Sequence, residues 1–284
     1  MTHRLEVFQS LWAMERRRPD GLEWSEEEKF ERIAAAGFHG VCFDLGHQDT
    51  DFVRRCWPLI ERHDLDVIFN AFPRGPADFR ELAGFAASLG PRVRFISIIG
   101  KVIPWRVDEC AAMTREWLAA GAEVGLPVYV EIHRNCMTND LLFTLQLMDA
   151  IPELMMTADL SHALVNQEWY LPLPDEAKTM ITRFLARSES FQGRVASREQ
   201  VQVALDFPQH RPWVELFEGW WREGFASWRA RHADRPDDAC VFLCELGPPP
   251  YAITGRDGYE LSDRWEESLV LKATAERLWA ETAP

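Results

Sequence analysis

Polar residues that bind metals or transfer protons end two apolar segments near the middle of the chain. The first segment, residues 127–133, is rich in β-branched and aromatic residues and ends with Glu131 and His133. The second, residues 154–162, is an apolar run followed by Asp159 and then His162. Short apolar runs of this kind predict buried strands. Each strand is therefore expected to deliver a carboxylate and an imidazole, which suit metal binding or proton transfer.

A helix is predicted between these two strands. Thr138 or Asn139 is a suitable N-terminal cap, apolar residues recur at helical spacing as far as Asp149, and Pro152 lies beyond the end. A strand, a helix and a second strand make a βαβ unit, in which the two strands are parallel. Both polar ends are therefore expected at the same edge of a parallel sheet.

The same alternation extends along the whole chain. Ser25 and Glu28 predict a capping box at the start of the first helix, and Gly37 closes that helix. The predicted strands are residues 5–12, 40–45, 66–72, 93–99, 127–133, 154–162, 189–195 and 239–246. The predicted helices are residues 26–36, 52–63, 76–89, 107–124, 138–149, 175–186, 212–232 and 262–281, with a loop after His162.

Eight strand and helix units without an intervening linker predict one α/β domain, residues 1–284, with the (β/α)8 TIM-barrel fold. A doubly wound open sheet is the alternative architecture. That fold usually has a Gly-rich phosphate turn after its first strand, and no such turn follows Trp12. The closed barrel is therefore favoured.

The active site of a TIM barrel lies at the C-terminal ends of its strands. The polar residues that end the last four predicted strands are Glu131, His133, Asp159, His162, Gln192, Arg194 and Glu245. Three buried carboxylates repel one another unless a cation lies between them, which predicts a metal site. Oxygen ligands from Glu131, Asp159, Glu245 and the amide of Gln192 suit Mg²⁺ or Mn²⁺ better than Zn²⁺.

These motifs resemble those of the sugar phosphate isomerase/epimerase family, the xylose-isomerase-like metal-dependent TIM barrels. The resemblance covers essentially the whole chain and is carried by residues 130–134, 159–162, 191–195 and 244–248. It implies that Glu131, Asp159 and Glu245 ligate a divalent cation and that the two glutamates also carry protons beside a carbonyl. Many members have His where this chain has Gln192, although some dehydratases, such as dehydroshikimate dehydratases, have Gln. The alternative for either glutamate is a loop residue paired with an arginine.

Four further residues are candidates for the site. His162 is expected at its rim, as a catalytic or substrate-binding residue, and His133, Arg194 and Trp12 are expected to bind substrate. Each has a structural alternative: His133 bonds a neighbouring loop, His162 is structural, Arg194 pairs with a barrel carboxylate and Trp12 caps the core. Gln192 is either a ligand or an ordinary polar residue.

The predicted function is a divalent-metal-dependent isomerase or epimerase of a small, polyhydroxylated, sugar-like keto compound. Glu131 or Glu245 removes a proton beside the carbonyl to give an enediolate, and the other glutamate returns it. Two alternatives stay open. One is a dehydratase or related lyase, in which the enediolate expels a leaving group. The other is a non-catalytic barrel that serves as a subunit or binding module.

The composition of the chain limits the kinds of partner and the location that we expect for the protein. The net charge of −14 disfavours nucleic acid, and no apolar stretch approaches the ~20 residues of a membrane helix. The six cysteines have no C-x-x-C pairing, so we expect a cytoplasmic, reducing location. Aromatic residues at helical spacing within residues 213–228 predict core packing, with a lid or the interface of a homo-oligomer as the alternative.

Overall fold

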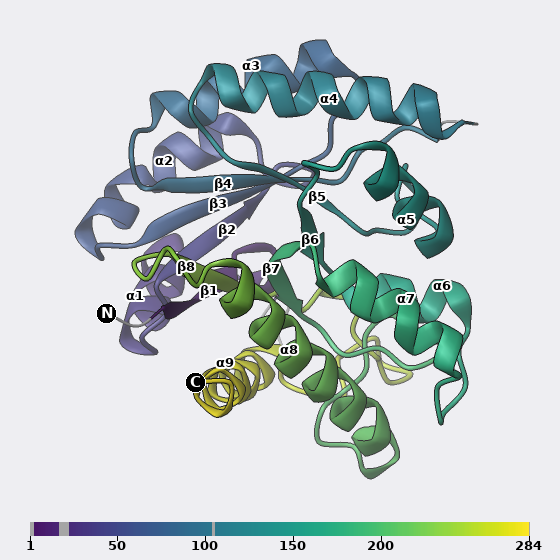
Figure 1. Cartoon of the computed structure of the whole chain (residues 1–284). Coiled ribbons are helices and arrows are strands. Elements are labelled where there is room, and N and C mark those ends of the chain that lie inside the picture. Colours follow the sequence, from purple (N-terminus) through teal and green to yellow (C-terminus); the bar gives the residue numbers. More distant parts are fainter. Residues whose placement is uncertain (1–2, 17–22, 104–105, 284) are drawn as a thin grey trace.

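The computed structural model describes residues 3–16, 23–103 and 106–283. Eight parallel strands form a closed barrel in chain order, and the last strand pairs with the first (Figure 1). The strands are β1 Arg4–Ser10, β2 Gly40–Asp44, β3 Asp66–Ala71, β4 Val93–Ile98, β5 Val128–Glu131, β6 Met156–Ala158, β7 Ser188–Gly193 and β8 Ala239–Cys244. The predicted (β/α)8 TIM barrel is confirmed.

Helices surround the barrel (Figure 1). The described α-helices are α1 Glu26–Ala35, α2 Thr50–Arg62, α3 Pro76–Ser88, α4 Val107–Glu123, α5 Leu141–Ala150, α6 Leu160–Gln167, α7 Asp175–Leu185, α8 Arg211–Arg231 and α9 Arg264–Glu281. Within the described residues, the 3-10 helix η1 Trp12–Met14 follows β1, and the 3-10 helix η2 Pro208–His210 precedes α8. The capping box at α1 is confirmed, since Ser25 Oγ accepts a hydrogen bond from the Glu28 amide at 3.2 Å and the Glu28 carboxylate accepts one from the Ser25 amide at 2.8 Å.

The sequence predictions were wrong in three local details. The sixth strand ends at Ala158, and α6 follows at once where a longer strand and a loop were expected, because the Asp159 side chain caps that helix. The cap of α5 is Asp140, whose Oδ1 accepts from the amide of Phe143 at 2.9 Å. Trp12 lies in η1, beyond the end of β1.

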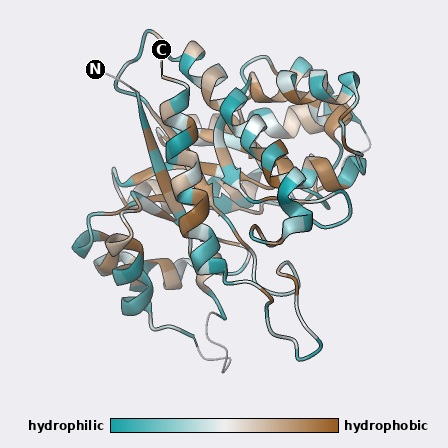
Figure 2. Ribbon diagram, turned by 90° about the horizontal axis from the view of Figure 1, so that it is seen from below, coloured by the Kyte–Doolittle hydropathy of each residue, from teal (hydrophilic) through white to brown (hydrophobic). Residues whose placement is uncertain are grey.

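The interior of the barrel contains a layer of apolar side chains from the strands. This inner layer is made of Phe8, Cys42, Ile68, Phe95, Val241 and Leu243, with Tyr129 packed against it. Figure 2 shows the hydrophobic residues of the barrel strands and of the helix faces that cover them. The barrel is therefore a packed core, and an inward-pointing residue two positions further along a strand lies one layer nearer to the C-terminal face.

The aromatic residues of α8 pack mainly in the core. Phe217, Trp220, Trp221, Phe225 and Trp228 are buried, and Trp213 is half-buried against the same core.

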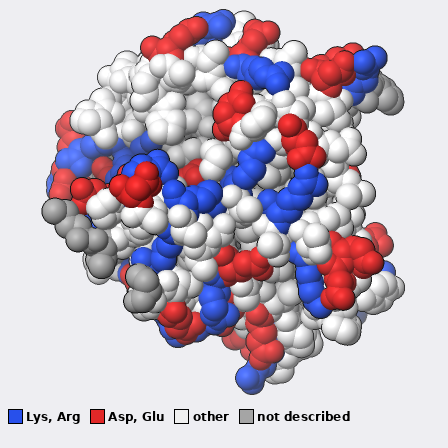
Figure 3. Space-filling view, viewed as in Figure 1, with Lys and Arg blue, Asp and Glu red and all other residues white. Residues whose placement is uncertain are grey.

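Within the described residues, no helix is long and apolar enough to cross a membrane. Basic and acidic side chains are interspersed on the face in Figure 3.

Candidate active site

A layer of polar side chains lies directly above the apolar inner layer. Along five strands, an inward-pointing residue of the inner layer is followed two positions later by a polar one: Asp44 on β2, Asn70 on β3, Ser97 on β4, Glu131 on β5 and Glu245 just after β8. All five are buried. The alternation of side chains along a strand therefore places five polar groups at one end of the barrel.

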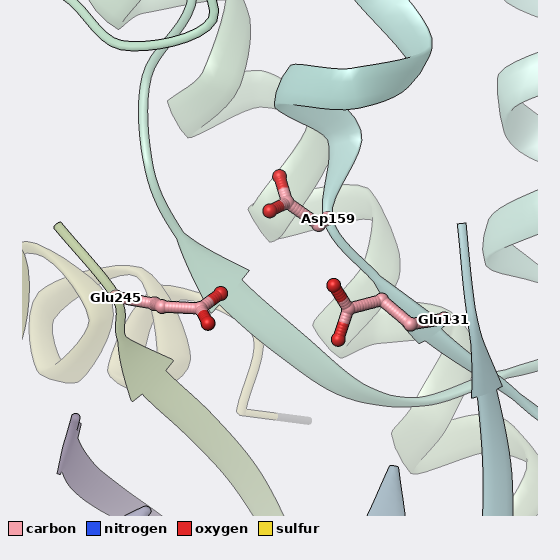
Figure 4. A group of neighbouring side chains, drawn as sticks. All are labelled: Glu131, Asp159 and Glu245. Atoms are coloured by element: carbon pink, nitrogen blue, oxygen red, sulfur yellow. The ribbon is translucent and has the colours of Figure 1, made fainter. Parts of the chain in front are cut away.

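Three carboxylates converge in this layer. Ligand atoms of Glu131, Asp159 and Glu245 lie within 4.8 Å of one another, and Figure 4 shows the three carboxyl groups turned toward a common point. Glu131 and Asp159 are 0% exposed and Glu245 is 3% exposed. Glu131 Oε1, Asp159 Oδ2 and Glu245 Oε2 accept no hydrogen bond from the described residues. Glu131 and Asp159 therefore each keep one oxygen available for a cation, whereas Glu245 Oε2 also lies 2.9 Å from Arg194 Nη2.

Two residues of the segment after Phe191 contact this carboxylate group. Gln192 Nε2 donates to Glu131 Oε2 at 3.0 Å, and Gln192 Oε1 accepts no hydrogen bond from the described residues. Arg194 Nη2 lies 2.9 Å from Glu245 Oε2 and 3.5 Å from Asp159 Oδ2, while its Nε donates to the backbone oxygen of Glu245 at 3.0 Å. Both side chains are buried. Arg194 is therefore paired with barrel carboxylates, which is one of the two roles predicted for it from the sequence.

The three buried carboxylates repel one another, and a bound cation would relieve that repulsion. Burial, followed by repulsion from Glu245 and Asp159, raises the pKa of Glu131 well above its ordinary value. Burial also raises the pKa of Glu245 to about 8, although Arg194 opposes this shift. Without a further positive charge, the site favours protonated carboxyl groups near neutral pH.

The oxygens in this group fit a hard divalent ion. Such an ion prefers carboxylate and amide oxygens, and the site presents four of them: Glu131 Oε1, Asp159 Oδ2, Gln192 Oε1 and Glu245 Oε2, the last of which also lies 2.9 Å from Arg194 Nη2. A divalent ion would also remove the repulsion that raises the pKa of Glu131. Mg²⁺ and Mn²⁺ both match this ligand set.

The rings of the two predicted histidines contact each other at an interplanar angle of 39° beside the carboxylates. The ring centroids of His133 and His162 are 3.9 Å apart, and His162 Nε2 lies 3.4 Å from Asp159 Oδ2. The expectation that His162 lies at the rim is wrong, because it follows Asp159 into α6 and is 1% exposed. Burial lowers the pKa of His133 to about 3 and that of His162 well below its ordinary value. Both rings are therefore neutral at pH 7.

A cavity of about 470 Å³ opens above the polar layer. Trp12, His133, Arg194 and Glu245 line it, so the candidate substrate-binding residues are brought together with one of the carboxylates. The Trp12 ring makes an edge contact with Tyr251 at 5.1 Å between centroids, and the Arg194 guanidinium lies 5.8 Å from the Trp12 ring. The cavity is thus bounded by aromatic rings on one side and by the polar layer below.

Sequence reasoning missed the contribution of strands β2 to β4 to the site. Asn70 Nδ2 donates to Glu245 Oε1 at 2.9 Å, and Ser97 Oγ lies 3.2 Å from Glu131 Oε2. Asp44 lines the cavity, and burial raises its pKa to about 6. A signal was present, because these residues also end apolar strands, as Glu131 and Glu245 do.

No protein-family model matches the sequence, and comparison with curated proteins gives no significant match. Solved structures are similar over nearly their whole length. D-psicose 3-epimerase from Clostridium cellulolyticum H10 has a TM-score of 0.59 and 10% identity, covering 97% of this chain and 99% of the epimerase. A xylose isomerase-like TIM barrel protein from Mycobacterium smegmatis, in complex with magnesium, has a TM-score of 0.61 and 12% identity, covering 98% of each chain.

A third similar structure belongs to a different reaction class. The probable 3-DHS dehydratase involved in petrobactin synthesis from Bacillus anthracis has a TM-score of 0.56 and 14% identity, covering 96% of this chain and 98% of the dehydratase. Epimerases and a dehydratase thus share this scaffold. The resemblance inferred from the sequence motifs is confirmed at the level of the fold: the chain is a xylose-isomerase-like TIM barrel.

Proposed function

We propose that this protein is a divalent-metal-dependent enzyme that isomerises or epimerises a small polyhydroxylated keto compound. The observation that carries the proposal is the group of three buried carboxylates at the C-terminal end of the barrel, each with an oxygen that accepts no hydrogen bond from the described residues. Glu131, Asp159, Glu245 and Gln192 Oε1 are the proposed ligands. The epimerases among the similar structures support this reaction class.

The two glutamates are the proposed proton carriers. They reach the site from β5 and from the end of β8; Glu245 lines the cavity, and Glu131 lies below it in the same carboxylate group. One glutamate removes the proton beside the carbonyl, and the other returns a proton to the opposite face or to the neighbouring carbon. A bound divalent ion supplies polarisation of the carbonyl oxygen.

The surrounding residues keep these carboxylates in position. Gln192 and Ser97 hold Glu131 Oε2, while Asn70 holds Glu245 Oε1. Arg194 offsets negative charge at Glu245. The neutral ring of His162 lies beside Asp159 and against the ring of His133, which lines the cavity and can offer Nε2 to a substrate hydroxyl group because its Nδ1 bonds the backbone oxygen of Arg134 at 2.6 Å.

A dehydratase is the second candidate. It shares proton removal beside the carbonyl but then expels a β-hydroxyl or another leaving group. Two observations favour it: the chain has Gln192 where many sugar isomerases of this fold have His, and a probable dehydratase is among the similar structures. The reaction products distinguish the two, because only the dehydratase changes the elemental composition of the substrate.

The test combines metal analysis with isotope exchange. The purified protein should bind about one Mn²⁺ or Mg²⁺ per chain. Incubation with a panel of ketoses and keto acids in deuterated water should then give product or recovered substrate with deuterium at the carbon beside the carbonyl. Failure to bind a divalent ion would favour the non-catalytic barrel. Turnover without deuterium but with a required nicotinamide cofactor would point to hydride transfer.

A further inference from the structure

The cavity above the carboxylates is lined by two kinds of charged group. Glu245 and Arg194 belong to the polar layer, whereas the loops after β3 and β4 contribute Arg74 and Lys101 to the lining. Arg74 lies three residues after the end of β3 and Lys101 three residues after the end of β4. A ligand in the cavity can therefore meet both the proposed reaction site and two basic side chains from these loops.

Neither basic side chain has a carboxylate partner among the described residues. Lys101 Nζ lies 3.4 Å from the backbone oxygen of Asn135 and 5.7 Å from the ring of Phe72. Arg74 forms its hydrogen bond to Asp78 through its backbone amide, and its guanidinium makes no ion pair within the described chain. By contrast, Arg194 in the same cavity is paired with Glu245 at 2.9 Å. Two cations at the cavity wall are thus left without a negative partner.

The acids of the site do not neutralise these two cations. The Asp44 carboxylate, the other acid in the cavity wall, accepts a hydrogen bond from the Gly46 amide at 2.9 Å. Four carboxylates lie in or below the cavity: Asp44, Glu131, Asp159 and Glu245. A divalent ion together with Arg74, Lys101 and Arg194 exceeds their charge by one positive unit. A neutral polyol leaves this excess in place, whereas a ligand with an anionic group removes it.

We propose that the substrate carries an anionic group, a carboxylate or a phosphate, at the end remote from its carbonyl, and that Arg74 and Lys101 bind this group. The inference rests on the proposed function, which places the carbonyl at Glu131 and Glu245. The cavity of about 470 Å³ is of the size that holds a small metabolite. Arg74 and Lys101 then select charged substrates over neutral sugars.

The test uses matched pairs of neutral and charged sugars as probes. Calorimetry on the Mn²⁺-loaded protein compares D-fructose with D-fructose 6-phosphate, and D-glucose with D-glucuronate, whose charged group is remote from the carbonyl carbon. At least one charged member should bind about 25-fold tighter than its neutral partner, since each of the two ion pairs should contribute about fivefold. The pair that shows the preference identifies phosphate or carboxylate as the anion.

Arg74→Gln and Lys101→Gln should each reduce that preference about fivefold and leave Mn²⁺ affinity unchanged, because neither residue contacts the carboxylate group. Arg62→Gln, at the exposed end of α2, is the control and should change neither. If the protein binds Mn²⁺ but shows no preference, or a preference that both variants retain, this inference is overturned and the proposed function stands. If the wild type does not bind Mn²⁺, the proposed function fails and this inference fails with it.

Discussion

Gln192 donates a hydrogen bond from Nε2 to Oε2 of Glu131 at 3.0 Å, while its own Oε1 accepts none from the described residues. The side-chain amide of Gln192 therefore has two roles in the proposed site. Its nitrogen fixes one oxygen of the carboxylate, so that the other oxygen, Glu131 Oε1, faces the centre of the site. In the proposed metal site, its oxygen would add a neutral, hard ligand to the three carboxylates.

Substitution of Gln192 should alter metal binding before anything else. Gln192→Leu removes both the hydrogen bond and the ligand oxygen, so we expect Mn²⁺ affinity to fall about tenfold or more. Gln192→His should keep a metal but shift the preference toward Zn²⁺, Co²⁺ or Ni²⁺, because imidazole is a softer ligand. Calorimetric titration with Mn²⁺ and Zn²⁺ measures both. The exposed Gln200→Leu serves as the control. Unchanged affinity and preference in both Gln192 variants would mean that Gln192 is not a ligand, and His162 would be the next residue to test.

Removal of either proposed proton carrier should abolish turnover without unfolding the barrel. Glu131→Gln and Glu245→Gln keep the shape of the side chain but cannot carry the proton, and we expect rates to fall by about 10²- to 10⁴-fold. Circular dichroism should show an unchanged fold, because these side chains lie at the strand ends, above the packed inner layer. Glu116→Gln on the exposed face of α4 is the matched control. A near wild-type rate in either active-site variant would contradict the proposed mechanism.

The metal-free protein should become less stable as the pH rises from 6.5 to 8. The pKa of Glu245 is about 8 in the folded state, against an ordinary value of 4.5, so over this range the folded chain holds a proton that the unfolded chain has released. The free energy of unfolding then decreases with pH, by on the order of 2 kcal/mol from Glu245 alone. The lowered pKa values of His133 and His162 act in the opposite direction, but only below their ordinary value of 6.5.

Urea denaturation with EDTA at pH 6.5 and pH 8 measures this change. Glu245→Gln has no titrating carboxyl group at this position, so the difference between wild type and variant isolates its contribution. Mn²⁺ at pH 8 should restore the stability of the wild type, since the ion binds the ionised carboxylates. A wild-type protein that loses no more stability than Glu245→Gln between pH 6.5 and pH 8 would refute the pKa assignment.

Two glycines of α8 offer a test of packing outside the site. A Cβ added to Gly224 would overlap the ring of Phe191 on β7, whereas one added to Gly219 meets no atom within 4 Å. Gly224→Ala should therefore destabilise the protein by about 1–3 kcal/mol. Gly219→Ala should stabilise it by up to about 1 kcal/mol, because alanine has the higher helix propensity. Thermal denaturation compares the two, and equal effects would show that α8 does not pack against β7 at Gly224.

Much of the fold could be predicted from the sequence because parallel strands buried on both faces appear as continuous apolar runs. The same property indicated which residues end the strands, and so located Glu131, Asp159 and Glu245. It did not show where the sixth strand stops. There, Asp159 caps α6 by accepting a hydrogen bond from the Ser161 amide at 3.1 Å, and this local interaction carries His162 into the interior.

The contacts within the site between residues far apart in the chain could not be predicted from the sequence. The contacts of Asn70 with Glu245 and of Ser97 with Glu131 join residues that are 175 and 34 positions apart. Pairing of β4 with β5 brings Ser97 to Glu131, and closure of the barrel brings Asn70 to Glu245. Arg194 likewise had two predicted roles, and the structure places its guanidinium both against Glu245 and in the cavity wall.

All six cysteines are buried and free, and burial raises the pKa of every one of them. Alkylating reagents attack the thiolate, so the folded chain should resist them and each modification should mark a local opening of the structure. Cys240 on β8 lies at the seam where the barrel closes, Cys136 lies in the loop after His133, and Cys56 lies on the outer ring in α2. The order in which these thiols become labelled would rank the seam, the active-site loop and the outer ring by how readily each one opens.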